Sequence, residues 1–484
     1  MTVGEAAGCL ALLVTSSSAV DGFGFVPETG NCAYRIAMAG AAVLLACVVA
    51  VCCTLASGAG LSSTSVCGGI FAPTFNRAVP AYTGFIKPTS TFQFADSSCQ
   101  RVPIQGPNVW GWLELAAGVQ ANPPGVADGI PAGCDGITYV MSRMVQDGQP
   151  VARVRFHGAS SDFAVEQSPG VYNEAALKAL DYIVYRAGQY GVKLLAVLAD
   201  NWQKADSTYN YAMWATGTNQ TDSFFANPTA IGLYQNHIKQ IITRTNTITG
   251  VKYSEDPAIF AWDLINEPRS TQGSACLQAC SQAISTWGIN QAAFVRTLDA
   301  NHPITVGTEG FWGVGSPYKQ YNPSYSTGSL WSSTTGQDFD TQFLSANLFA
   351  SYHYWPDLWG DVSTTFETNW IAQHDADAKT LGKALVLSEF GKQYNNTISP
   401  TDAARTAARQ EIYDQIFKVY GPAYSTDNTL QGVMFWRFAN TPVNSGGDAN
   451  EVAGLDALYT KTIAPAYLAI LKASGTATGC TKSG

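Results

Sequence analysis

Eight short apolar runs alternate with helix-like stretches along most of this chain, and this alternation constrains its fold more than any other feature. Each run has the length and composition of a strand that is buried on both faces. Eight strands alternating with helices predict an α/β fold, the TIM (β/α)8 barrel. The runs are residues 109–112, 151–156, 193–199, 259–265, 304–307, 348–352, 384–387 and 432–435, and the clearest helical stretches are residues 173–190, 229–245, 282–299, 365–381 and 401–420.

The chain is organised differently upstream of these runs. Residues 36–56 carry no charged side chain and directly follow Arg35. Their length fits a helix that spans a bilayer, and it also fits the core of a signal peptide. Both interpretations predict that the chain enters the secretory pathway. The protein would then be secreted, or membrane-anchored by residues 36–56, with any membrane contact confined to that segment.

These features divide the chain into five predicted segments. Residues 1–35 are predicted to be disordered, residues 36–56 are the signal anchor or signal-peptide core, and residues 57–100 form a linker or lead-in rich in Gly, Ser and Ala. Residues 101–475 form the barrel domain, which holds the catalytic candidates. Residues 476–484 form a C-terminal tail.

Six of the 11 cysteines follow the apolar segment, and an even number in an exported chain predicts up to three disulfides. Their pairing stays open, although Cys276 and Cys280 are close enough in sequence to pair locally. A metal site is the weaker interpretation, because the chain has five His and no second Cys pair at ligand spacing. Sequons at Asn219 and Asn395 are compatible with a glycoprotein. The six cysteines are Cys67, Cys99, Cys134, Cys276, Cys280 and Cys480.

The composition indicates the class of ligand. Charged residues make up only 13% of the chain and aromatic residues 12%, which suits neutral ring-shaped ligands such as sugars. A large core would also need aromatic residues, so composition alone does not decide between these explanations. The net charge of −9 argues against nucleic acid as a partner. We expect a polysaccharide substrate, with no cofactor and no metal.

Two glutamates end apolar runs, where a barrel places its active residues. Glu267 ends the run IFAWDLINE and Glu389 ends ALVLSE. Either residue alone could be an ion pair or a helix cap at a strand end. Together, on the fourth and seventh strands, they match the acid and nucleophile of a retaining glycosidase, whose carboxyl groups lie about 5–5.5 Å apart. Asn266 is placed to bind the sugar's 2-hydroxyl group.

Longer segments around these glutamates resemble one family. The sequence is similar to glycoside hydrolase family 5 from about residue 105 to residue 471, and in its finer features to the plant-type endo-β-1,4-mannanases. The resemblance implies retaining, endo-acting hydrolysis of β-1,4-mannosidic linkages in mannan, glucomannan or galactomannan. The segments are NEP, SEFG, SPGVYNE, YQNHIKQIITRTNTITG, EDPAIFAWDLINEPR, GTEGFWG and LVLSEFGK.

The resemblance also implies roles for individual residues. Glu267 matches the acid/base and Glu389 the nucleophile, while Arg153 matches the arginine that positions the nucleophile and keeps it ionised. The other positions that match substrate-binding residues, or that we assign to the substrate surface with them, could each be ordinary packing residues. They are Trp110, Asn201, Trp202, Asn266, His353 and Trp436.

Four positions depart from the mannanase pattern. Trp355 stands where the family has a tyrosine that hydrogen-bonds the nucleophile, and Tyr352 or Tyr354 are possible substitutes. Asp200 replaces the first Asn of an Asn-Asn-aromatic motif. At the other two positions, Arg155 replaces Trp and His157 replaces Phe.

These departures concern substrate preference more than reaction type. An extra guanidinium at residue 155 would bind an acidic or substituted sugar, or pair with Asp162. Within the family, an endo-β-1,4-glucanase or a transglycosylase stays open as an alternative. A catalytically silent glycan-binding protein is the alternative from another class, and the intact pair Glu267 and Glu389 argues against it.

Overall fold

The computed structural model describes residues 77–482 except for residues 119–135, 159–162, 203–204, 272–277, 329–334, 395–400, 426–428 and 440–448. The predictions for residues 1–35 and 36–56, and those for Cys276 and Asn395, therefore lie outside the described residues. Among the helices that are described, none is long and apolar enough to cross a membrane.

Among the described residues, eight parallel strands form two sheets of four. One sheet has the order β10-β11-β12-β3 and the other the order β4-β7-β8-β9. In chain order the strands are β3 (Gly106–Pro107), β4 (Val151–Arg155), β7 (Lys193–Val197), β8 (Ile259–Asn266), β9 (Ile304–Gly307), β10 (Ala350–Tyr354), β11 (Leu385–Phe390) and β12 (Leu430–Phe435).

Isolated parallel bridges join the two sheets at both seams. Asn108, just after β3, pairs with Arg153 of β4, and Ile304 of β9 pairs with Leu348, just before β10. Each of the eight strands therefore has a parallel neighbour on both sides. The predicted α/β TIM-barrel fold is confirmed.

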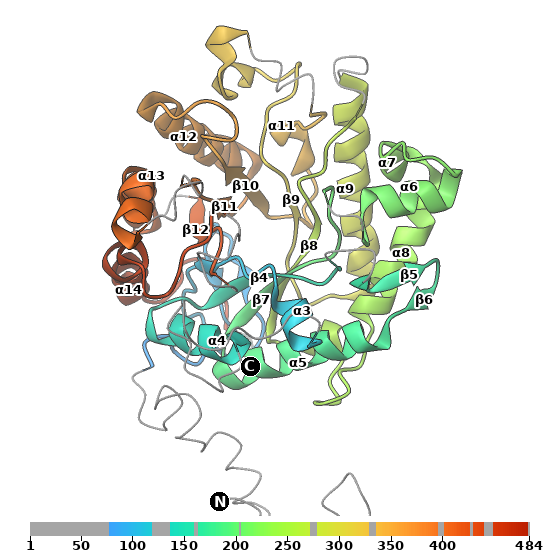
Figure 1. Ribbon diagram of the computed structural model, residues 1–484, viewed down its shortest axis with the longest axis horizontal. Coiled ribbons are helices and arrows are strands. Elements are labelled where there is room, and N and C mark those ends of the chain that lie inside the picture. Colours follow the sequence, from blue (N-terminus) through green and yellow to red (C-terminus); the bar gives the residue numbers. More distant parts are fainter. Residues whose placement is uncertain are drawn as a thin grey trace, which may run out of the picture. The chain divides into compact units, whose positions relative to one another are not determined.

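Helices surround the strands (Figure 1). The start and stop signals of α5 (Glu174–Tyr190) act as expected, since Asn173 accepts backbone N–H groups and Gly191 ends the helix at φ 68°. The other α-helices of the described residues are α3 (Trp112–Ala116), α4 (Gly136–Gln146), α6 (Thr208–Thr216), α7 (Ser223–Ala226), α8 (Pro228–Ile242), α9 (Gln278–Leu298), α11 (Phe339–Gln342), α12 (Thr364–Leu381), α13 (Asp402–Ser425) and α14 (Ala464–Ala473).

Short elements complete the described chain. Two antiparallel hairpins pair β1 (Lys87–Pro88) with β2 (Phe94–Ala95), and β5 (Glu166–Ser168) with β6 (Val171–Tyr172). The single-turn helices are η2 (Tyr253–Glu255), η4 (Lys319–Tyr321), η5 (Tyr325–Thr327) and the π-type η6 (Tyr459–Ile463).

The first predicted strand, residues 109–112, is wrong. The strand is β3, which ends two residues earlier, and Trp112 already begins α3. Val109 and Trp112 are fully buried, so their apolar character reflects burial and not strand geometry. The true strand contains Gly106 at φ 151°, where a Cβ atom would lie 2.0 Å from the carbonyl oxygen of Val151. Close approach of two backbones thus selects glycine at a position that strand propensity disfavours.

The described part of the predicted linker is folded against the C-terminal tail. Cys99 and Cys480 form a disulfide, although 381 residues separate them in sequence. The N–H of Ala477 donates to the carbonyl oxygen of Cys99 at 2.9 Å. Cys280 is disulfide-bonded as well. The Gly- and Ser-rich composition predicted a linker here. The local sequence does not reveal the contacts with the distant C-terminal tail that fold this segment.

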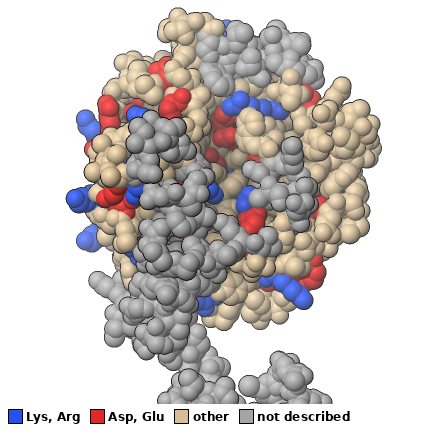
Figure 2. Space-filling view, viewed as in Figure 1, with Lys and Arg blue, Asp and Glu red and all other residues tan. Residues whose placement is uncertain are grey.

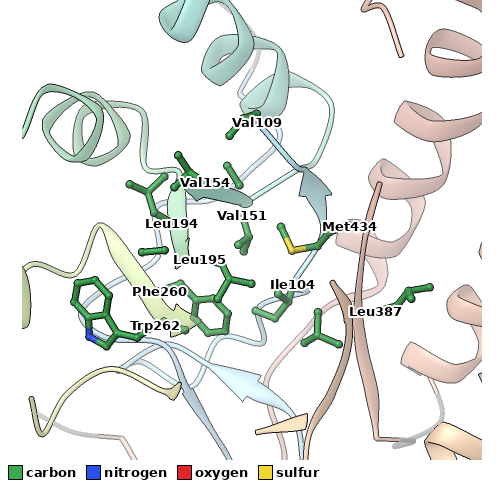
Figure 3. Packing of buried hydrophobic residues seen from close by; sticks show 14 of the residues in the cluster. Ile104, Val109, Val151, Val154, Leu194, Leu195, Phe260, Trp262, Leu387 and Met434 are labelled. Carbon is green, nitrogen blue, oxygen red and sulfur yellow. The ribbon is translucent and has the colours of Figure 1, made fainter. Parts of the chain in front are cut away.

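The barrel interior is filled by side chains from all sides of the ring. Figure 3 shows Ile104, Val151, Leu195 and Met434 converging from different strands and their lead-ins. Phe94 of β2 packs edge-on against Phe260 and Phe349, each with ring centroids 5.3 Å apart. Since Phe260 and Phe349 lie at the amino ends of β8 and β10, the β1–β2 hairpin covers that end of the core.

The disulfide between Cys99 and Cys480 should stabilise the fold without supporting the site. We expect the double variant Cys99→Ser/Cys480→Ser to lose about 2–5 kcal/mol of unfolding free energy, because the denatured chain regains the freedom of a very long loop. Denaturant unfolding of both proteins measures this. A variant that unfolds at the parent's denaturant concentration would contradict the prediction, and its activity at low temperature should match the parent's.

Candidate active site

Three titratable side chains meet at the carboxyl ends of the strands. Glu267 directly follows β8, His353 lies in β10 and Glu389 lies in β11. One oxygen of each carboxylate and an imidazole nitrogen all lie within 4.8 Å of one another. Nδ1 of His353 is 2.7 Å from Oε1 of Glu267 and 3.5 Å from Oε2 of Glu389. The structure thus brings together the two carboxylates that the sequence singles out, with the predicted histidine between them.

Arg153 of β4 connects four side chains inside the barrel. Its guanidinium donates to Asp263 at 3.0 and 2.8 Å, to Asn108 at 3.1 Å and to Asn266 at 2.9 Å. It also forms an ion pair with Glu389. Arg153 and Asp263 are fully buried and Glu389 is 3% exposed. Buried charges are tolerated only when they are paired and hydrogen-bonded, so the members of this network depend on one another.

Gly307, the last residue of β9, makes room for this network. A Cβ atom there would lie 2.6 Å from an oxygen of Asp263 and 2.8 Å from Nη2 of Arg153. The N–H of Gly307 donates to Asp263 at 2.7 Å, and its carbonyl oxygen accepts the N–H of Glu267 at 2.6 Å. The fifth strand therefore supports the environment of both carboxylates and excludes a larger residue at its end.

Glu267 is held in a strained backbone conformation. Its φ of 47° is left-handed, which costs a non-glycine residue on the order of 1–3 kcal/mol. Trp202 donates from its indole N–H to Oε2 of Glu267 at 2.6 Å. The Arg269 guanidinium lies over the Trp202 ring at 4.9 Å, and Trp202 stays 51% exposed. These contacts fix the direction of the carboxylate and leave Trp202 available to a ligand.

Glu389 receives a donor from the residue that departs from the family pattern. The indole N–H of Trp355 donates to Oε2 of Glu389 at 3.3 Å. A Cβ atom at Gly391 would lie 2.8 Å from the Trp355 ring, so this glycine is needed to seat the indole. Tyr352 stacks on a histidine ring and Tyr354 packs against other aromatic rings, and neither hydroxyl has a hydrogen-bond partner among the described residues. Trp355 is therefore the donor, and the two tyrosines are not.

Burial controls the proton affinities of the site. It raises the pKa of Glu267, and it raises that of Glu389 well above its usual range, with the charge of Glu267 adding to the rise at Glu389. Two buried carboxyls this close favour a state with one proton between them. Arg153 opposes the rise in the pKa of Glu389 and contacts this carboxylate directly through their ion pair. Burial keeps the pKa of His353 well below its usual value, so the imidazole is neutral at pH 7.

An aromatic surface lies beside the carboxylates. Trp436 follows β12 and is half-buried, with its ring centroid 5.0 Å from that of Trp110 and 6.0 Å from that of Trp355. Trp110 is buried and supports Trp436 from behind. A tryptophan held in this way presents a fixed ring of the kind on which sugars stack. Figure 2 shows one face of the molecule hollowed near its centre, where acidic and basic side chains lie together.

The two predicted asparagines have different surroundings. Asn266 is bound on both sides of its amide, by Arg153 and by Asp200 at 3.4 Å. Asn201 is half-buried, and its side chain accepts from Thr208 at 3.4 Å. The backbone N–H of Asn201 donates to the carbonyl oxygen of Asn266 at 3.1 Å, which ties the ends of β7 and β8 together.

The sequence analysis missed four residues of this site. Asn108 and Asp263 bind Arg153, while Arg269 forms an ion pair with Glu309, which also accepts from Gln337 at 3.0 Å. A signal was present for each. Asn108, Arg269 and Glu309 lie shortly after strand ends, and Asp263 is a carboxylate inside an apolar run.

Among the described residues, Glu267, His353 and Glu389 are the one group close enough to hold a metal ion. Arg153 already pairs with Glu389, and Trp202 donates to Glu267. A guanidinium beside the carboxylates disfavours a second cation. We therefore assign these atoms to acid–base and nucleophilic chemistry and not to metal ligation.

Comparison with known proteins agrees with this geometry. The sequence model described as "GH family 5 beta-mannosidase-like" matches residues 155–450. The chain belongs to glycoside hydrolase family 5. Mannan endo-1,4-beta-mannosidase 1 of Arabidopsis thaliana is 30% identical over 384 residues, which cover 77% of this chain and 86% of the relative. The protein with the same description from Oryza sativa subsp. japonica is 32% identical over 335 residues, covering 65% and 72%.

Solved structures share the fold of this family 5 member. An endo-1,4-beta-mannanase from Rhizomucor miehei aligns with a TM-score of 0.63 at 22% identity, covering 80% of this chain and all of that one. The endo-1,4-beta-D-mannanase from Thermotoga petrophila aligns with a TM-score of 0.59 at 21% identity, covering 76% and 99%. At such identities the likeness concerns the fold alone.

Removal of the Arg153 guanidinium should destabilise the protein in a pH-dependent way. Arg153→Met leaves Asp263 and Glu389 buried without their cation, which costs about 3–5 kcal/mol at neutral pH. Arg153 lowers the pKa of both carboxyls, so its loss raises them further. The folded variant then holds protons that the unfolded chain releases above about pH 4. The stability difference from the parent should therefore grow as pH rises.

Denaturant unfolding at several pH values measures this difference. Arg244→Met is a matched control, because Arg244 also pairs with a buried aspartate, Asp181, but lies partly at the surface away from the site. A deficit for Arg153→Met that is independent of pH would contradict the electrostatic explanation.

Proposed function

We propose that this protein is a retaining endo-β-1,4-mannanase in which Glu389 is the nucleophile and Glu267 the acid/base. The observation that carries the proposal is the pair of carboxylates, with oxygens within 4.8 Å, at the carboxyl ends of β8 and β11. A retaining enzyme needs about 5–5.5 Å between its two carboxyls, whereas an inverting enzyme needs about 6.5–9.5 Å to admit a water molecule.

In the first step, a carboxylate oxygen of Glu389 attacks the anomeric carbon while Glu267 protonates the departing glycosidic oxygen. Arg153 favours the ionised form of Glu389, and Trp355 orients its second oxygen. Burial raises the pKa of Glu267, which suits it to hold a proton in neutral solution. The product is a glycosyl-enzyme ester on Glu389 and a free sugar hydroxyl group.

In the second step, Glu267 acts as the base. It now carries a negative charge and takes a proton from water, whose oxygen attacks the anomeric carbon and releases Glu389. Trp202 and His353 both contact the Glu267 carboxylate and hold it at the same place in both steps. Two displacements at one carbon restore its configuration, so the product is β.

The substrate class rests on two observations. The relatives named mannan endo-1,4-beta-mannosidase match most of the barrel. Trp202 contacts Glu267, and Trp436 packs against Trp355, which contacts Glu389, so an aromatic ring lies near each carboxylate. Such rings suit a chain of neutral sugars that continues past the cleaved bond. The same features would serve a β-1,4-glucan, so the experiment compares both.

Purified protein should hydrolyse soluble mannan and glucomannan faster than carboxymethyl cellulose, and it should shorten the polymer from within. Reducing-end release and product size on the three substrates measure this. The first product seen by proton NMR should be β-configured. Faster hydrolysis of carboxymethyl cellulose would favour the glucanase alternative, and an α product would refute Glu389 as nucleophile.

The two glutamate variants serve as matched controls in the same assay. Glu389→Ala should lose activity on every substrate. Glu267→Ala should keep the first step on substrates with a good leaving group, because such a group departs without a proton, and azide should restore its turnover as a β-glycosyl azide. Glycan binding by a wild type that cleaves none of the substrates would instead indicate a silent glycan-binding protein.

We also propose that the chain enters the secretory pathway and is secreted or anchored through residues 36–56. The uncharged segment after Arg35 supports this, and the disulfide of Cys99 and Cys480 is typical of exported proteins. Translation with microsomes should give a product that added protease cannot reach. A product that is fully degraded outside the vesicles would refute the proposal.

A further inference from the structure

Three of the positions that depart from the mannanase pattern lie together in the structure. Nε2 of His157 is 4.0 Å from Oδ2 of Asp200, and both residues are buried. Arg155 donates to Glu114 of α3 at 2.7 Å, and its guanidinium lies 5.5 Å from the centre of the Trp110 ring. Arg155 is 4% exposed, so it is a buried, paired residue and not a free cation that a substrate could reach.

Asp200 contacts the supports of Glu267. Its Oδ1 accepts the backbone N–H of Trp202 at 2.8 Å and the side-chain amide of Asn266 at 3.4 Å. Trp202 in turn donates to Glu267, and Asn266 is the residue before it. The backbone of Asp200 also pairs in parallel with that of Asn266. Asp200 is therefore linked to Glu267 through two residues, Trp202 and Asn266.

The charges around Asp200 come from three sides of the barrel. Arg155 and His157 face it from β4 and the residues after it, Glu267 faces it from the end of β8, and Glu389 faces it from β11. Burial keeps the pKa of His157 well below its usual value, so this imidazole is neutral and does not balance the carboxylate. Arg155 is the cation that acts on Asp200.

We propose that Asp200 is a positioning residue that holds Trp202 and Asn266 beside Glu267 and, when ionised, keeps the proton on Glu267 in neutral to alkaline solution. Arg155 is its counter-charge. This inference rests on the proposed role of Glu267 as acid/base and deepens it. It assigns a function to the carboxylate at position 200 that a neutral asparagine would not have.

The direction of the effect follows from the charges. An ionised Asp200 disfavours a second negative charge on Glu267, so Glu267 releases its proton at a higher pH than it would beside a neutral side chain. The repulsion is mutual: burial, and then the charge of Glu267, raise the pKa of Asp200 to about 7, and the same coupling holds the proton on Glu267 once Asp200 is ionised. Asp200 is thus neutral in acid, where Glu389 must ionise, and charged in base, where Glu267 must stay protonated. Its influence should be confined to the alkaline limb of the activity profile.

The test is the pH profile of kcat/KM from about pH 4 to about pH 9. The substrate is whichever of mannan, glucomannan and carboxymethyl cellulose the wild type hydrolyses fastest, and these three form the substrate panel. Asp200→Asn should move the alkaline limb down by about half a pH unit or more and leave the acid limb in place. Arg155→Met should move the alkaline limb up, because it removes a positive charge. His157→Phe removes a neutral group from the same cluster and should move neither limb.

Opposite shifts in the first two variants support the proposal, because a purely structural role would lower activity at every pH. Circular dichroism shows whether each variant is folded. If Asp200→Asn does not fold, the shift in Arg155→Met still tests the proposal. An unmoved alkaline limb in the folded variants, or an equal shift in His157→Phe, would overturn the inference while the wild type remains active. A wild type inactive on the whole panel refutes the proposed function itself, and the inference with it.

Discussion

The ion pair between Arg153 and Glu389 is the interaction on which the rest of the site depends. A guanidinium and a carboxylate are both expensive to bury, and their attraction offsets that cost only when every remaining donor is used. The remaining donors bind Asp263 and Asn266 of β8 and Asn108, which follows β3. Side chains from two other strands are therefore held around one cation. The barrel fold provides this convergence, because parallel strands deliver their carboxyl-terminal residues to one end.

Close packing of the network leaves little freedom in the backbone. Gly307 lacks the side chain that would collide with Arg153 and Asp263, and its carbonyl oxygen holds the N–H of Glu267. Glu267 accepts a left-handed φ in return, a strain that the surrounding contacts offset. Rigidity of this kind matters for catalysis, since a carboxylate that must serve as acid and then as base has to stay in reach of the same oxygen in both steps.

Much of this arrangement could be predicted from sequence, and the failures have physical causes. Seven of the eight apolar runs are strands, and the two glutamates at the ends of β8 and β11 do meet. The first run failed because apolar residues at the barrel mouth are buried whatever their backbone conformation. The Trp355 contact could not be read from strand alternation, since the ladder shifts register between Tyr352 and His353 and Trp355 lies just beyond β10. Contacts between distant segments, such as Cys99 with Cys480, leave no local pattern.

The departures at Asp200 and Arg155 are best understood as one electrostatic unit beside the Arg153 network. A carboxylate at position 200 is difficult to bury near Glu267 without a cation, and Arg155 is difficult to bury without Glu114. Glu114 therefore offsets the cost of burying Arg155, and Arg155 offsets the cost of burying Asp200. Among the described residues, Asp200 contacts Trp202 and Asn266, the two neighbours of Glu267, while Glu389 keeps its own cation. The ion pair of Arg153 and Glu389 thus constrains the reaction type, whereas Asp200 and Arg155 affect the pH range over which Glu267 keeps its proton. The residues at positions 200 and 155 can therefore change while the reaction type is preserved.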